Sequence, residues 1–167
     1  MLGSILFAAL LQVPTPDQEF VPGTTYDPTI PTLEAVVGHD FGEEVTHPDD
    51  VVRYFQALAD AAPDRTRLVQ YAESWEGRPL MAMVIGSAQR MANLEAVKAD
   101  LARLAAVRGL PAGEVDELLA SLPVVTALMH GVHGNEISSS GAAMAEAYHI
   151  LAPQNDPVVD VLLHESP

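Results

Sequence analysis

The sequence contains no cysteine, few basic residues and only 5% aromatic residues. The lack of cysteine excludes disulfide scaffolds, thiolate zinc sites and cysteine nucleophiles, so any metal site must use His, Asp or Glu. Eight Lys and Arg stand against 23 Asp and Glu, which gives a net charge of −15. Because nucleic-acid binding requires clustered Lys and Arg, this balance argues against a nucleic-acid partner. The 49% of hydrophobic residues in a chain of 167 are enough for one domain with a core.

The basic residues are confined to positions 53–108. The stretches before and after this region carry nine and eight carboxylates, respectively, and neither contains a Lys or Arg. We interpret these acidic flanks as solvated surface.

The first part of the chain is apolar but short. The run over residues 5–11 cannot cross a bilayer, which takes about 20 residues. It suits the apolar region of a secretory signal, although no Lys or Arg precedes it. We therefore assign residues 1–12 to a signal peptide and expect a secreted or periplasmic protein without a stable membrane span. Residues 13–31 are rich in proline and predict an extended lead-in, and residues 32–167 form the folded domain.

Local patterns predict a mixture of helices and strands. Residues 66–72 and 79–85 favour two strands, and the segment between them has the composition of a hairpin turn. Thr46 is the expected N-cap of the first long helix, and Val159, Leu162 and Leu163 are expected to share one face of the last helix. The expected helices cover residues 48–62, 88–108, 113–122, 136–151 and 156–167.

A continuous apolar run at residues 124–129 predicts a strand that is buried on both faces. A hairpin followed by a strand, a loop and a helix indicates the α/β class, with an α/β sandwich around a mixed sheet. Ligands of such sheets bind where loops leave the carboxyl ends of the strands. The loop at residues 130–136 follows the expected strand and is therefore the candidate site.

His133 and Glu136 form the only His-x-x-Glu pair in the chain. An imidazole in a loop and a carboxylate three residues later can converge on one cation, and both are accepted zinc ligands. In the alternative interpretation, Glu136 only stabilises a helix N-terminus and His133 is an ordinary loop residue. His130 is a further candidate ligand or base, or a hydrogen-bonded packing residue at the end of the strand.

A catalytic zinc ion needs three protein ligands, and the sequence offers no obvious third one. His149 lies 13 residues beyond Glu136, which is about 20 Å along a helix. No carboxylate is placed as an obvious general base either. The sequence pattern does not link the remaining histidines to the site: His39, His47 and His164.

Two motifs resemble the M14 family of zinc carboxypeptidases. Residues 131–139 read Gly-Val-His-Gly-Asn-Glu-Ile-Ser-Ser and are similar to the family's first zinc-binding segment. Residues 75–80 read Trp-Glu-Gly-Arg-Pro-Leu and resemble its hairpin signature. The resemblance implies an α/β/α sandwich and makes His133 and Glu136 the first two ligands of Zn²⁺.

The same resemblance implies that the site is incomplete in this chain. The family's third ligand, its substrate-binding residues and its general-base Glu come later than residue 167. Residues 32–167 are therefore expected to be the N-terminal part of a truncated catalytic domain that is inactive alone.

The implied function is that of a zinc-dependent metallocarboxypeptidase, which hydrolyses a peptide or amino-acid amide with metal-activated water. Asn135 stands where many members have an Arg that polarises the scissile carbonyl, so it is the candidate for that role. The same His-Gly-Asn-Glu motif occurs in zinc amidohydrolases of the aspartoacylase and succinylglutamate desuccinylase group, which is one alternative. A non-catalytic exported binding module is the other. The metal hypothesis requires His133 and Glu136 to face each other and residues 124–129 to pair in a sheet.

Overall fold

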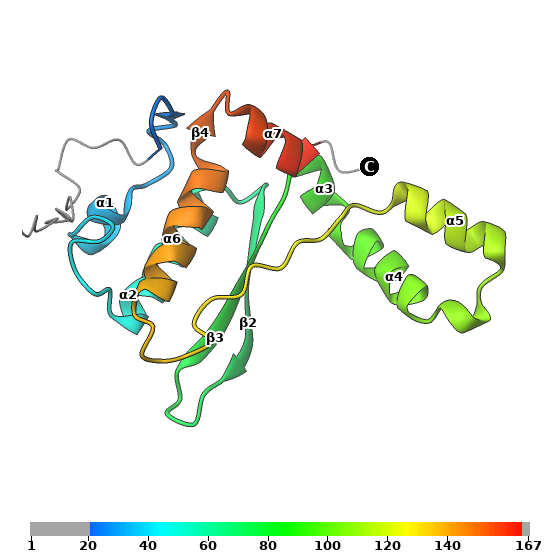
Figure 1. Ribbon diagram of the computed structural model, residues 1–167, viewed down its shortest axis with the longest axis horizontal. Helices are drawn as coiled ribbons and strands as arrows, with labels where there is room; N and C mark the ends of the chain where they lie inside the picture. The colour runs from blue at the N-terminus through cyan, green and yellow to red at the C-terminus, as the bar shows by residue number, and fades with distance from the viewer. Residues whose placement is uncertain (1–20, 165–167) are drawn as a thin grey trace, which may run out of the picture.

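The computed structural model describes residues 21–164 (Figure 1). The expected signal segment at residues 1–12 and the first part of the lead-in lie outside these residues. The described chain contains seven α-helices and two antiparallel pairs of strands. The expected α/β class is therefore confirmed.

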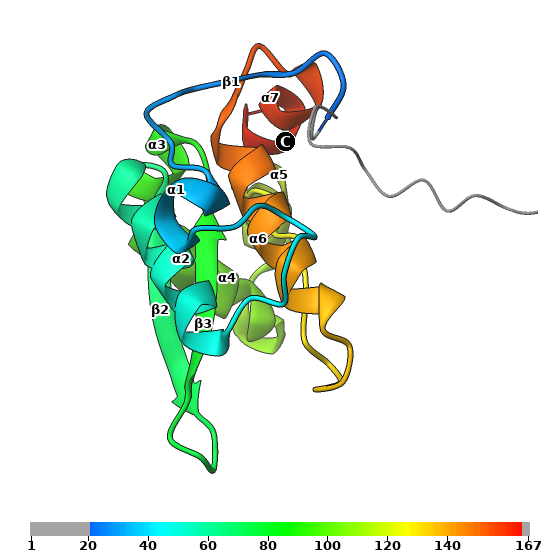
Figure 2. The same cartoon turned by 90° about the vertical axis from the view of Figure 1, so that its left-hand side faces the viewer.

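The core lies between helices α2 (Pro48–Ala61) and α6 (Ser138–Leu151), which pack side by side (Figures 1 and 2). Helix α1 (Leu33–Val37) packs on α2. The largest fully buried side chains come from these three helices: Leu33, Tyr54, Leu58, Met144 and Leu151. Burial of these apolar side chains is the main force that joins α6 to α2.

The start of α2 shows why this helix forms. Pro48 occupies the first turn, where its missing N–H costs nothing, and two aspartates follow it near the positive end of the helix dipole. The expected N-cap, Thr46, is wrong. The N-cap is His47, whose Nδ1 accepts a hydrogen bond from the Asp49 amide at 3.4 Å, because the helix begins directly at Pro48.

The predicted hairpin is confirmed by β2 (Thr66–Glu73) and β3 (Pro79–Ile85), which pair antiparallel from Thr66–Ile85 to Glu73–Pro79. The turn is closed by a hydrogen bond from the Ser74 amide to the Arg78 carbonyl at 2.9 Å. Gly77 has a φ of 75°, a conformation that favours glycine. Trp75 is fully exposed in this turn.

The expected buried strand at residues 124–129 is wrong. The segment between α5 (Ala112–Ser121) and α6 is irregular, and no strand among residues 21–164 pairs with it. Val124 and Met129 are 66% and 81% exposed. An apolar run can only become a buried strand where a partner strand supplies hydrogen bonds to its backbone. The described residues form sheets only by pairing β2 with β3 and β1 (Thr25–Tyr26) with β4 (Pro153–Gln154).

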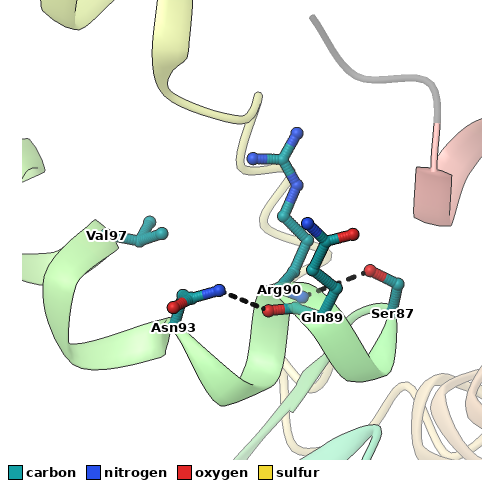
Figure 3. A pocket seen from close by; sticks show the side chains of 5 residues that line it. All are labelled: Ser87, Gln89, Arg90, Asn93 and Val97. Carbon is teal, nitrogen blue, oxygen red and sulfur yellow. Dashed lines mark hydrogen bonds between the residues drawn. The ribbon is translucent and has the colours of Figure 1, made fainter.

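The expected long helix at residues 88–108 is divided into α3 (Ala88–Ala92), α4 (Leu94–Ala105) and a short 3₁₀ turn (Val107–Gly109). Asn93 lies at the break, and its side-chain amide donates to the Gln89 carbonyl at 2.9 Å (Figure 3). A side chain that bonds a carbonyl four residues earlier competes with the helical backbone. The expected helix at residues 113–122 is confirmed by α5, which packs on α4 to form a lobe apart from α2 and α6 (Figure 1).

The last helix, α7 (Pro157–His164), is confirmed in position but not in its expected apolar face. Asp156 caps it, since its Oδ1 accepts from the Val158 amide at 2.9 Å. Val159 is 6% exposed, whereas Leu162 is 58% exposed and Leu163 is partly exposed. A helix at the periphery buries only the side chains that reach the neighbouring elements.

The described part of the lead-in is packed against α6. Tyr26 stacks on Tyr148 with ring centroids 5.0 Å apart, and its hydroxyl lies 3.0 Å from His149 Nδ1. Ile30 is 3% exposed and belongs to the core. This segment therefore contributes to the same core as α2 and α6.

The buried tyrosines predict a loss of stability at alkaline pH. Burial raises the pKa of Tyr54 above its ordinary value of 10.0, and burial also raises the pKa of Tyr148. Below about pH 10 these phenols are protonated in both states, but above it the unfolded chain releases protons that the folded chain retains. The free energy of unfolding, measured with urea by circular dichroism, should therefore stay constant up to about pH 9 and fall as the pH rises above about 10.

The Tyr54→Phe variant should lose less of its stability over this range, because it lacks the most perturbed phenol. Tyr71, which is 65% exposed, provides the control. Tyr71→Phe should lose as much as the wild type, and an equal loss in both variants would contradict the assignment to Tyr54.

Candidate metal centre

The candidate site is the loop that leads into α6. The Glu136 amide donates to the His133 carbonyl at 3.1 Å, and the Ser139 amide donates to the Glu136 carbonyl at 3.0 Å. These consecutive turns bring the side chains together, with His133 Nδ1 2.9 Å from Glu136 Oε1. Both side chains are more than half exposed. The first condition of the metal hypothesis, that the two side chains face each other, is therefore found in the structure.

The two donor atoms suit a zinc ion. Zinc binds imidazole nitrogen and carboxylate oxygen at about 2.0–2.2 Å, so two donors in a tetrahedral site lie about 3.4 Å apart. The observed separation of 2.9 Å is that of a direct hydrogen bond between His133 and Glu136. An opening of about half an ångström would place both donors at the distance of a shared ion. The pair therefore fits as two of the three protein ligands of a zinc site.

No group of three or more His, Asp or Glu residues that could hold a metal ion occurs within residues 21–164. His130, the nearest candidate, lies 2.8 Å from the carboxylate of Glu146 through its Nε2. This contact attaches His130 to α6, and its role as a ligand or base stays a prediction.

Three of the other described histidines have polar partners outside the loop. His149 contacts Tyr26 beside the core, His47 caps α2, and His39 Nε2 lies 3.4 Å from the Thr46 hydroxyl. His164 belongs to α7, at the opposite end of α6 from the loop (Figures 1 and 2). Among residues 21–164, His133 and Glu136 are therefore the candidate zinc ligands that lie together.

Asn135 lies in the turn between His133 and Glu136 and is exposed. Its neutral amide can donate a hydrogen bond to a substrate oxygen but carries no positive charge. Its role in polarising a substrate stays a prediction.

Sequence reasoning missed the part that Ser139 plays in this loop. The Gly131 amide donates to Ser139 Oγ at 2.8 Å, and Gly131 has a φ of 72°. A hydroxyl in the first turn of a helix that follows a glycine-containing loop is the signal that could have indicated this contact.

The second condition of the metal hypothesis, pairing of residues 124–129 in a sheet, is not met within the described chain. The assignment of the family therefore depends on the loop, the hairpin and their order along the chain, rather than on that strand.

Comparison with known proteins bears on the same region. A family model described as zinc carboxypeptidase matches residues 51–166, which include most of α2, the β2–β3 hairpin, the loop and α6. No curated protein and no solved structure matches the chain. Because the family model covers more than half of the sequence, and includes both the hairpin signature and the His-x-x-Glu pair, the chain belongs to the M14 zinc carboxypeptidase family.

Proposed function

We propose that this chain forms part of a zinc-dependent metallocarboxypeptidase in which His133 and Glu136 bind the zinc ion. The observation that carries the proposal is the 2.9 Å contact between His133 Nδ1 and Glu136 Oε1 in a loop that the family model covers. The family is one of peptidases, so the proposed substrates are peptides or amino-acid amides.

The residues of the loop have distinct parts in this proposal. His133 must be neutral so that its ring nitrogen can donate a lone pair, and Glu136 adds a negative charge beside it. A bound zinc ion would lower the pKa of a water molecule and polarise a carbonyl. Asn135 would donate a hydrogen bond to a substrate oxygen. No third ligand accompanies the pair within residues 21–164, so we do not expect the described residues alone to hydrolyse substrate.

One observation favours a second candidate function. Asn135 is neutral, whereas a guanidinium at this position would polarise a peptide carbonyl more strongly. A zinc amidohydrolase similar to the aspartoacylase and succinylglutamate desuccinylase group would keep the same two ligands. Comparing hydrolysis of a peptide and of an N-acyl amino acid by a preparation with a complete site would separate the two.

Export is also part of the proposal. The apolar run at residues 5–11 supports a secreted or periplasmic protein, although it lies outside the described residues. No helix within residues 21–164 is long and apolar enough to cross a membrane. The intact mass of the protein recovered from cells would show whether residues 1–12 are removed.

Zinc titration of the full chain tests the ligand assignment. We expect the His133→Ala and Glu136→Gln variants each to bind zinc at least about tenfold more weakly than the wild type in calorimetry, because each removes one donor. The control is His47→Asn, which removes an exposed imidazole while retaining an N-cap of α2. Equal affinity of wild type and His133→Ala would remove His133 from the ligand set.

A further inference from the structure

We infer that Ser139 and Glu146, which both belong to α6, are positioning residues that hold the loop at residues 130–136 so that His133 faces Glu136. This inference rests on the proposed zinc function and concerns how the site is kept in shape. Neither residue touches the two proposed ligand atoms, since their side chains contact Gly131 and His130.

Ser139 joins the two arms of the loop. Its Oγ accepts from the Gly131 amide at 2.8 Å, two residues before His133. Its own amide donates to the Glu136 carbonyl at 3.0 Å. One residue in the first turn of α6 therefore fixes both the incoming and the outgoing backbone of the ligand loop.

The contact with Gly131 is not a helix cap. The N-cap position of α6 is Ile137, which makes no side-chain capping bond. A serine at a helix start ordinarily accepts from an amide of its own helix. Ser139 instead accepts from an amide eight residues earlier in the sequence, so its hydroxyl connects the helix to the loop.

Glu146 provides the second point of attachment. Its Oε2 lies 2.8 Å from His130 Nε2, and the two side chains are 46% and 26% exposed. Glu146 follows Ser139 by seven residues, which is about two helical turns, so both side chains lie on one face of α6. The backbone at residues 130–131 is thus held along this face at two points.

The opposite side of α6 is anchored in the core. Met144 and Leu151 are 0% and 1% exposed and belong to the same cluster as Leu58 of α2. The loop itself is exposed from residue 131 to residue 138 and contributes no buried side chain. Its shape must therefore come from contacts with α6, because apolar burial does not restrain it.

The test uses the full chain with three substitutions: Ser139→Ala, Ser139→Thr and Ser140→Ala. The Ser140 hydroxyl donates only over 3.4 Å to Ile137, within its own turn, which makes it the matched control. We expect Ser139→Ala to weaken zinc binding by about tenfold, as loss of contacts that orient metal ligands does. Ser139→Thr, which keeps a hydroxyl, should restore the affinity, and Ser140→Ala should resemble the wild type.

Amide hydrogen exchange in the absence of metal provides a second readout. Exchange of residues 131–136 should be faster in Ser139→Ala than in Ser140→Ala, while the thermal unfolding midpoints of the two variants stay equal. Glu146→Ala should also speed exchange at residues 130–131, because it removes the partner of His130.

The outcomes distinguish the two proposals. If His133→Ala weakens zinc binding but Ser139→Ala does not, the positioning role is wrong and the ligand assignment stands. If the wild type and His133→Ala bind zinc equally, the ligand assignment fails, and exchange decides the role of Ser139. Equal exchange in the Ser139→Ala and Ser140→Ala variants overturns the positioning role.

Discussion

Replacing Leu58 with alanine is expected to lower the free energy of unfolding by about 2–5 kcal/mol. Leu58 is fully buried in α2, in a core cluster that includes Met144 and Leu151 of α6. The substitution removes apolar contacts and leaves a cavity that the surrounding helices fill only in part. These contacts join α2 to α6, the helix that follows the ligand loop. The loss of unfolding free energy in Leu58→Ala therefore also measures how strongly the core holds α6. Urea denaturation followed by circular dichroism gives the change.

Leu119→Ala is the matched control for Leu58→Ala. Leu119 also lies in a helix, α5, but it is 59% exposed. The two substitutions change helix propensity equally, so the difference between their losses of stability measures the effect of burying the leucine side chain. Leu119→Ala should change stability by less than about 0.5 kcal/mol. A similar loss in both variants would show that Leu58 does not lie in a packed core.

Replacing Arg65 with methionine should lower the free energy of unfolding by about 1–3 kcal/mol. The Arg65 guanidinium donates from Nη2 to the Leu151 carbonyl at 2.7 Å, in a partly buried position. This carbonyl belongs to the last turn of α6, where carbonyls have no amide partner within the helix. Methionine keeps an apolar stem but leaves this acceptor unpaired.

Arg67 offers the comparison for Arg65. It lies two residues further along, in β2, and is exposed. Arg67→Met should leave the denaturation midpoint close to that of the wild type. If Arg65→Met is no more harmful than Arg67→Met, the bond to Leu151 does not contribute to holding the end of α6.

The elements that the sequence predicted well are those that depend on short-range signals. The β2–β3 hairpin follows from two β-favouring runs around a turn with Gly77, and α2 follows from apolar spacing after Pro48. These signals act within a few residues, so the structures that they predict do not depend on distant parts of the chain.

The elements that the sequence predicted wrongly depend on partners or on single side chains. Whether residues 124–129 form a strand is decided by a neighbouring strand, which apolar periodicity cannot reveal. The break at Asn93 is set by one hydrogen bond to Gln89 within a pattern that otherwise favours a continuous helix.

In the candidate site, too, short-range contacts could be predicted from the sequence and contacts between distant residues could not. The closeness of His133 and Glu136 could be predicted, because residues three apart meet across a single turn. The contact between Gly131 and Ser139 depends on the positive φ of Gly131 and on where α6 begins, and neither can be read with precision from sequence. Tyr26 and His149 are 123 residues apart, and only the folded core brings them together.

The exposed turn of the hairpin has a consequence for spectroscopy. Trp75 is the single tryptophan of the chain and is in contact with water in the folded state. Its fluorescence should therefore change little when the core unfolds. A thermal unfolding curve recorded by tryptophan emission would show a smaller transition than one recorded by circular dichroism. A change in this fluorescence would report specifically on a molecule that binds at the turn between β2 and β3, because the chain has no second tryptophan.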